Sequence, residues 1–206
     1  TPRRSAASAE QTRAAILAAT IKVVAQHSLS GTTVERVAVA AGVAPATVIL
    51  HFKRKEALLV AVLEELAREF ELARQQALLG AAEDPVAALN RLIDATFDPP
   101  VSDPAKIAVW YAFWGEAGSR SVYLERCGSI DHTYFADLEK ICANLAERGG
   151  YTHIEPKAAA MGLVGSIEYL WQEIMVAGPA FDRERARRTV RNYLANLYPQ
   201  HFTTEP

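Results

Sequence analysis

Residues 32–58, TTVERVAVAAGVAPATVILHFKRKEAL, are the stretch that decides the fold of this chain. Apolar residues recur at helical spacing on both sides of Gly42, which predicts two short helices over about 33–40 and 45–52. Gly42 suits the tight turn between them, and Pro45 stands at the first helical position, where proline is tolerated. Two short helices joined by a tight turn with glycine are typical of a helix-turn-helix.

Both helix starts in this motif carry groups that suit a phosphate backbone. Thr32 and Glu35 read as a T-x-x-E capping box, which predicts Thr32 as the cap of the first helix. Thr32 and Thr33 then lie where free backbone N–H groups and the helix dipole favour a phosphate. A second natural phosphate contact precedes the next helix, at the three cations Lys53, Arg54 and Lys55.

The second short helix has the shape that a major groove admits. Val48 and Phe52, four residues apart, are expected to pack it against the two helices before it. The alternative that the residues leave open is a three-helix cap with a basic edge and no DNA partner. The end that would enter the groove is slim, because it consists of Ala44, Pro45, Ala46 and Thr47.

Outward from this motif the chain reads as helices interrupted by glycine and proline, and strand signals are nearly absent. The predicted fold class is all-α, with a three-helix head over residues 1–55 and a helical body over residues 56–206. The predicted helices are about nine, over 10–27, 33–40, 45–52, 55–79, 85–97, 104–118, 121–148, 155–177 and 182–198.

The net charge of −2 conceals a strong asymmetry between head and body. Residues 1–55 carry eight basic and two acidic side chains, a net of +6, whereas the remainder carries a net of −8. A basic head on an acidic body fits a head that meets a polyanion. The chain has no apolar run long enough for a membrane span, so no membrane partner is expected.

The sequence lacks the motifs of several classes of enzyme and of metal-binding protein. There is no G-x-S-x-G, H-E-x-x-H or Walker motif and no Cys/His metal spacing, so we expect no enzyme, no metal site and no cofactor. Cys127 and Cys142 lie far apart in one predicted helix and cannot pair without breaking it. Two buried thiols are typical of a reducing cytoplasm, where we expect the protein to act.

The head resembles the tetracycline-repressor (TetR) family of transcriptional regulators. The match lies in Thr32–Ala38 (TTVERVA), Gly42–Ala44 (GVA) and His51–Leu58 (HFKRKEAL). The resemblance implies phosphate contacts from Thr33, His51 and Lys55. It also implies that Pro45, Ala46 and Thr47 face the bases. The predicted DNA-binding set is Thr32, Thr33, Ala44, Pro45, Ala46, Thr47, Ile49, Leu50, His51, Lys53 and Lys55.

Two positions depart from the family pattern. Ala44 replaces the family's capping serine, which should cost about 0.5–2 kcal/mol of local helix stability. Ile49 replaces a frequent tyrosine, so a hydroxyl contact to phosphate is lost. We therefore expect mostly apolar base readout, from Ala46, Thr47 or Ile49 against thymine methyl groups.

The predicted helices of the body carry apolar stripes that need partners. Over 155–177 two stripes are predicted, Leu163, Ile167, Leu170 and Ile174 on one side, and Met161, Val164, Glu168, Trp171 and Met175 on the other. A helix apolar on two sides has two partners. The family resemblance implies a homodimer through the last two long helices, which would present two recognition helices to a palindromic site.

Glu168 is the titratable group singled out, because it falls within one of these apolar stripes. A buried carboxylate needs a cationic or hydrogen-bonding partner. That partner is either internal, in a structural pair with Arg or Tyr, or a bound cationic ligand held with help from aromatic rings. The predicted ligand-binding set is Trp110, Tyr111, Trp114, Tyr134, Glu168 and Trp171, although aromatic residues at helical spacing are also common in cores.

The body resembles the choline-responsive, BetI-like repressors of betaine synthesis. The stretches that carry this are Asn90–Pro99 (NRLIDATFDP), Trp110–Trp114 (WYAFW), and Tyr169–Trp171 (YLW) followed by Phe181–Asp182 (FD). The resemblance implies a small-molecule effector, with a cationic amine such as choline as one candidate. Effector binding would spread the heads and release operator DNA. The alternatives are a helical dimeric adaptor and an activator without ligand-released repression.

Overall fold

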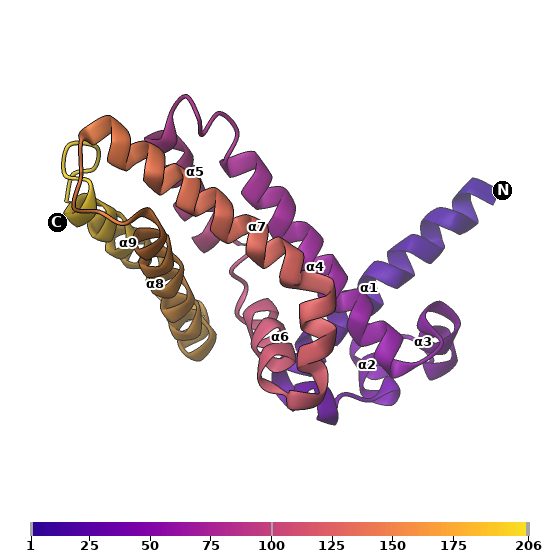
Figure 1. The fold of residues 1–206 in the computed structure, drawn as a ribbon. Helices are drawn as coiled ribbons and strands as arrows, with labels where there is room; N and C mark the ends of the chain where they lie inside the picture. The colour runs from indigo at the N-terminus through magenta and orange to yellow at the C-terminus, as the bar shows by residue number, and fades with distance from the viewer. Residues whose placement is uncertain (1, 100, 205–206) are drawn as a thin grey trace. The chain divides into compact units, whose positions relative to one another are not determined.

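The structure is a computed structural model that describes residues 2–99 and 101–204, with side chains from Ser8 onward. All regular elements in these ranges are helical, which confirms the all-α prediction (Figure 1). They are α1 (Pro2–Gly31), α2 (Val34–Ala41), α3 (Pro45–Phe52), α4 (Lys55–Ala77), α5 (Pro85–Phe97), α6 (Pro104–Gly115), α7 (Ala117–Gly149), α8 (Pro156–Ala177), the 3-10 turn η1 (Gly178–Ala180) and α9 (Arg183–Leu197).

The chain forms two compact units. The first comprises Thr1–Leu66 and Ala105–Arg126, and the second comprises Ala67–Pro104 and Cys127–Pro206. The first unit thus holds α1–α3, the beginning of α4, α6 and the beginning of α7. No single helix in the described ranges is long and apolar enough to cross a membrane.

Local capping rules account for most helix starts. Asp84 accepts a hydrogen bond from Ala87 N at 2.9 Å and so caps α5. Asp182 accepts from Arg185 N at 2.9 Å and caps α9 in the same way. Glu155 caps α8 by accepting from the backbone N–H groups of its first turn. Prolines begin α5, α6 and α8, because a first helical position needs no N–H donor.

In the first unit, α2 packs on α1 and on α3. Helix α1 starts earlier than predicted, at Pro2, and breaks at Ser28, whose backbone has φ 62° and ψ 178°. Its core face joins the buried sides of the short helices and of α4. The residues that share this core include Ile16, Val24, Val37, Val48, Val62 and Leu63.

In the second unit, α9 packs against α5 and α8. The predicted inner stripe of α8 is confirmed for Leu163, Ile167 and Ile174, which are buried. The two free cysteines, Cys127 and Cys142, are buried as expected. Helices α5, α7, α8 and α9 and the residues directly after α9 build this core. Its fully buried side chains include Leu89, Ile93, Leu138, Leu145, Ile174, Val190 and Tyr198.

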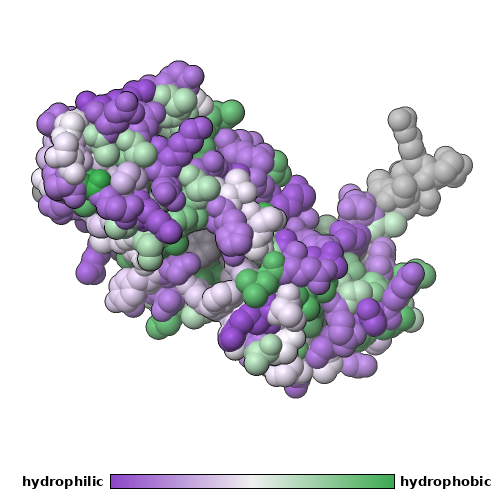
Figure 2. Space-filling model, in the orientation of Figure 1, coloured by the Kyte–Doolittle hydropathy of each residue, from purple (hydrophilic) through white to green (hydrophobic). Residues whose placement is uncertain are grey.

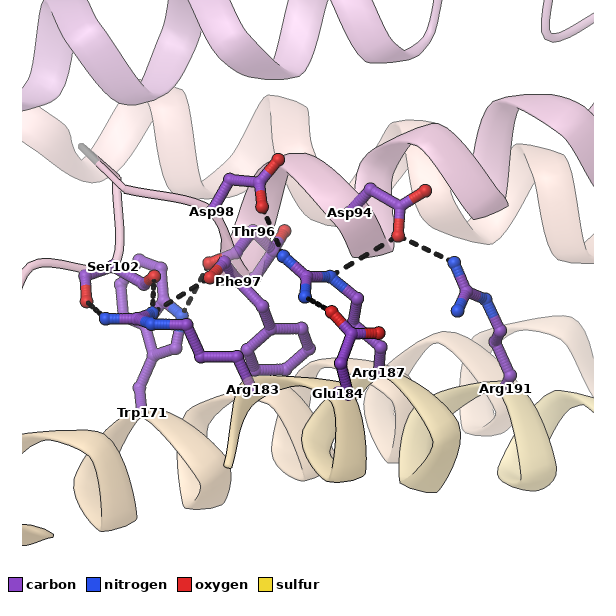
Figure 3. A network of polar contacts seen from close by, with 10 residues as sticks. All are labelled: Asp94, Thr96, Phe97, Asp98, Ser102, Trp171, Arg183, Glu184, Arg187 and Arg191. Atoms are coloured by element: carbon purple, nitrogen blue, oxygen red, sulfur yellow. Dashed lines mark hydrogen bonds and ion pairs between the residues drawn. The ribbon is translucent and has the colours of Figure 1, made fainter. Parts of the chain in front are cut away.

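A ladder of ion pairs joins α9 to the C-terminal end of α5 (Figure 3). Arg187, whose side chain is 9% exposed, pairs with Asp94 and Asp98. One turn later on α9, Arg191 donates to Asp94 at 2.6 Å. The acids recur at four-residue spacing on α5 and the arginines at four-residue spacing on α9. The two helices therefore stay in one register along this contact.

Candidate DNA interface and effector site

Helices α2 and α3 meet at a bend of 107°. Gly42 ends α2 in the left-handed conformation, with φ 67°. Its N–H donates to Val39 O at 3.2 Å, and the N–H of Val43 donates to Ala38 O at 3.0 Å. This pairing is a Schellman motif, which a residue with a side chain would strain. The steep angle and the glycine turn are those of a helix-turn-helix.

The start of α2 corrects the predicted capping register by one residue. Thr33, not Thr32, is the cap, because its hydroxyl accepts from Arg36 N at 3.2 Å. Thr32 is fully buried, and its hydroxyl donates to Ser28 O at 2.7 Å. Its side chain therefore faces the protein, whereas Thr33 lies half-buried at the helix start.

A carboxylate completes this helix start. The backbone N–H of Glu35 and then the hydroxyl of Thr33 hydrogen-bond its side chain and lower its pKa. The capping box predicted for Thr32 and Glu35 is therefore not formed, because the Glu35 carboxylate is bound by its own N–H and by the Thr33 hydroxyl and not by the N–H of the cap residue.

Helix α3 has the anatomy expected of a recognition helix. No side chain caps it at Ala44, as the sequence predicted, and Pro45 occupies its first turn. Val48 and Phe52 are buried and hold it on the unit, which confirms their predicted packing role. The opposite face is exposed and is formed by Pro45, Ala46, Ile49 and Leu50.

The basic residues after α3 differ in what they contact. Lys53 and Arg54 are exposed, which leaves both cations at the surface beside α3. The ammonium group of Lys55 instead donates to Leu29 O at 3.1 Å and to Ser30 O at 3.4 Å. Lys55 thus stabilises the carbonyl end of α1. Its contact with a DNA phosphate stays a prediction, and it requires the ammonium group to bind the phosphate in addition to these carbonyl groups or in place of them.

One contact of the first unit has no signal in the sequence. The break at Ser28 leaves the N–H of Leu29 outside the α1 ladder, and this N–H donates to Glu116 Oε1 at 3.2 Å. Glu116 lies between α6 and α7, so the end of α1 is bound both by this corner and by Lys55 of α4.

The predicted ligand residues of α6 differ in burial. Helix α6 buries Ile107, Val109 and Phe113, whereas Trp114 is 48% exposed. Trp110 and Tyr111 are half-buried. The three predicted ligand residues of α6 therefore lie outside its fully buried side, and their role in ligand binding stays a prediction.

The first unit supplies its own cation to this aromatic group. Tyr123 of α7 makes edge contacts with Trp110 and Trp114, with ring centroids 6.0 and 5.4 Å apart. The guanidinium of Arg120 lies over the Trp114 ring at 5.8 Å, and its Nε donates to Trp114 O at 3.0 Å. A face that could attract a ligand cation thus already faces an arginine.

The other three predicted ligand residues, Tyr134, Glu168 and Trp171, lie in the second unit. Phe70 of α4 makes edge contacts with both Tyr134 (5.4 Å) and Trp171 (6.2 Å). The indole N–H of Trp171 donates to Thr96 O at 3.2 Å. Phe70 was not predicted, because an aromatic residue on a long helix does not show from sequence which neighbours it meets.

A buried arginine stands one turn from Phe70. The Arg74 side chain is 5% exposed, and it donates to Glu71 through Nε at 2.8 Å and through Nη2 at 2.6 Å. It also pairs with Asp137. The hydrogen bonds from Arg74 lower the pKa of Glu71. Both acids are needed, because a buried guanidinium without partners would be costly.

Glu168 corrects the prediction of a carboxylate buried in an apolar stripe. It is exposed on α8. Partial burial by surrounding atoms, with Asp131 nearby, still raises its pKa. Glu168 in turn acts on Tyr134, whose pKa is raised first by burial and then by this carboxylate. Glu168 therefore lies close enough to Tyr134 for its negative charge to act on the phenol.

A small cavity adjoins this group. Its volume is about 10 Å³, and its lining includes Phe70, Arg74 and Thr96. This volume is near the minimum for one water molecule, so a quaternary ammonium ion would have to widen it. In the described part of the chain, no cluster of His, Cys, Asp or Glu is placed to hold a metal.

A basic helix-turn-helix unit in an all-helical chain defines a class of protein, the DNA-binding transcriptional regulators. The family of bacterial regulatory proteins of the tetR type matches residues 16–62, and the C-terminal family of BetI-type transcriptional repressors matches residues 85–199. The chain belongs to the TetR family, with a BetI-type C-terminal region, which confirms the predicted resemblance. Both families are transcriptional regulators, not enzymes.

Individual relatives agree with this assignment. The chain is 30% identical to the HTH-type transcriptional regulator BetI of Paraburkholderia phymatum, over 93% of this chain and 95% of the relative. It superimposes with a TM-score of 0.69 on a crystal structure described as a transcriptional regulator from Pseudomonas aeruginosa PAO1, at 25% identity over 94% and 95% of the chains. AibR, solved with isovaleryl coenzyme A and operator DNA, shares the fold at a TM-score of 0.65 and 19% identity, over 91% of this chain and 98% of AibR.

Proposed function

We propose that this protein is a homodimeric repressor that binds a palindromic operator through α2 and α3 and leaves it when a small cationic amine binds the second unit. The exposed face of α3, between the α2 start and the cations Lys53 and Arg54, is the observation that carries the DNA-binding part. The repressor action is supported by the BetI-type match over residues 85–199. Such a protein would act on DNA in the bacterial cytoplasm.

The charge around Tyr134 supports a cationic effector. Arg74 is held by Glu71 and Asp137, and Glu168 and its neighbour Asp131 add two further acids. Acidic side chains thus gather around Tyr134. The rings of Phe70, Tyr134 and Trp171 lie among them, and aromatic faces attract quaternary ammonium groups. The roles of Trp110, Tyr111 and Trp114 in binding stay predictions.

Release of DNA requires that the effector favour a second conformation. The cavity beside Phe70 is too small for such a ligand, so binding would separate the helices that line it. A ligand that bound both conformations with equal affinity would not shift the equilibrium between them and would not release the DNA. AibR, a protein of the same fold, is described with both a small molecule and operator DNA.

The proposed dimer uses an apolar face of α8 that the chain itself does not cover. Met161, Tyr169 and Val176 are 59%, 62% and 83% exposed. They recur at helical spacing, so they form one stripe on the helix. The occupant we propose is a second copy of the chain, because a twofold dimer would present two α3 helices to a palindrome.

Fluorescence anisotropy with an operator selected from random DNA tests the proposal. We expect tight binding that weakens steeply with salt, because phosphate contacts release counterions. Choline, added at rising concentration, should release the DNA. Salt-insensitive binding without sequence preference would refute the repressor, whereas specific binding that choline and related amines leave unchanged would refute the cationic effector alone.

A pair of glutamates on α8 provides the matched control. Glu168→Gln should weaken the choline response several-fold and leave operator affinity without choline unchanged, because only the carboxylate charge is removed. Glu173→Gln removes the same charge from an exposed position on the same helix and should leave the response intact. Equal responses of the two variants would remove Glu168 from the effector site.

A further inference from the structure

The outward face of α3 is almost purely apolar. Ile49 is 44% exposed and Leu50 is 80% exposed, and Pro45 and Ala46 beside them are exposed as well. Hydrophobic side chains lie at the outer edge of the first unit in Figure 2, where Figure 1 places α3. Large apolar side chains gathered in the open indicate a surface that is covered in the working complex.

The polar groups of α3 are turned away from this face or already used. Ala44 has no side-chain donor or acceptor, and Pro45 has no N–H. The N–H of Thr47 donates to Ala44 O at 2.9 Å, and its side chain is half-buried. His51 is half-buried against the Phe52 ring, with centroids 6.2 Å apart.

This composition conflicts with the usual way of reading bases. Direct readout in the major groove relies on arginine, lysine, asparagine or glutamine, which bond the edges of guanine and adenine. None of these stands on the exposed face of α3. The apolar feature that the major groove offers is the C5-methyl group of thymine.

We propose that α3 selects its operator through thymine C5-methyl groups, with Ile49 and Leu50 as the specificity-determining contacts. The inference rests on the proposed operator binding and deepens it by naming the feature that is read. Lys53 and Arg54 would supply affinity for any sequence, and the two apolar side chains would supply the choice among sequences.

Uracil in place of thymine tests this inference, because it removes only the methyl group. We expect the selected operator to lose about fourfold in affinity for each methyl that is buried, as hydrophobic transfer of one methyl predicts. Contacts in both half-sites should together give tenfold or more. The double variant Ile49→Ala/Leu50→Ala should bind the thymine and uracil operators equally.

Two control variants separate this readout from general effects. Leu79→Ala shortens another leucine, 70% exposed and outside α3, and should keep the full preference for thymine. Lys53→Ala should weaken both operators by one common factor. Circular dichroism of each variant checks that the helices are intact.

The outcomes distinguish this inference from the proposed function. Specific, salt-sensitive binding with equal affinity for thymine and uracil operators overturns methyl readout and keeps the repressor. A selected operator without thymine at the protected bases does the same. Failure to select any sequence overturns both.

Discussion

Lys53 adopts a strained backbone between α3 and α4. Its φ is 63°, and the N–H of Arg54 donates to Phe52 O at 2.7 Å, which closes a γ-turn around it. Glycine adopts this conformation without strain, whereas a residue with a Cβ, such as Lys53, adopts it only at a cost in free energy. The free energy of unfolding of Lys53→Gly should therefore exceed that of Lys53→Ala by about 1 kcal/mol. Urea unfolding of the two variants measures this difference. Both variants lack the charge, so equal stabilities would show that the turn is unstrained.

The pair of Glu71 with Arg74 predicts a dependence of stability on pH. Hydrogen bonds from Arg74 lower the pKa of Glu71 in the folded chain, so the ionised pair stabilises the fold above the unfolded pKa of about 4.3. That stabilisation is lost as the pH falls through the lower, folded pKa. Glu71→Gln should cost about 1–2 kcal/mol at pH 7 and progressively less below pH 4.

Urea unfolding from pH 7 down to pH 3.5 measures this difference. The exposed Glu173→Gln should show no comparable cost at either end of the series. A cost of Glu71→Gln that stays constant over this range would show that its source is packing and not the ion pair.

At the scale of elements, the contact of α8 with α9 depends on a glycine. A Cβ at Gly162 would overlap the hydroxyl of Tyr193, which donates to Ala159 O at 3.0 Å. Gly162→Ala should thus cost about 1–3 kcal/mol, because the packed ring must shift. Gly128→Ala, in α7, meets no atom within 4 Å and should stabilise its helix. Thermal unfolding compares them, and similar melting temperatures would contradict the close packing.

Local chemistry predicts the elements better than it predicts their corners. Asp182 caps α9 and Gly42 ends α2 by rules that involve neighbouring residues only, so both were predictable. The corner between α6 and α7 was expected over 118–121 but lies at Glu116. This acid binds the N–H of Leu29, 87 residues away in sequence, and no local pattern announces such a contact.

At the scale of the whole molecule, the proposed dimer can be broken from one exposed position. Tyr169→Arg places a charge in the centre of the apolar stripe of α8 and should convert the dimer to a monomer in light scattering. Operator affinity should fall with it, since two heads bind more tightly than one. Leu124→Arg, at a 52% exposed site on α7, should remain dimeric. A dimeric Tyr169→Arg would place the interface elsewhere.

The sequence by itself determined the helix-turn-helix, the all-helical class and most helix ends, because turns, caps and apolar periodicity act over a few residues. Only the tertiary structure decided that Thr33 rather than Thr32 caps α2, and that Lys55 binds the end of α1. It also placed Glu168 at the surface and joined Phe70 to Tyr134 and Trp171. Burial and partnership depend on segments far apart in the chain, which local patterns cannot specify.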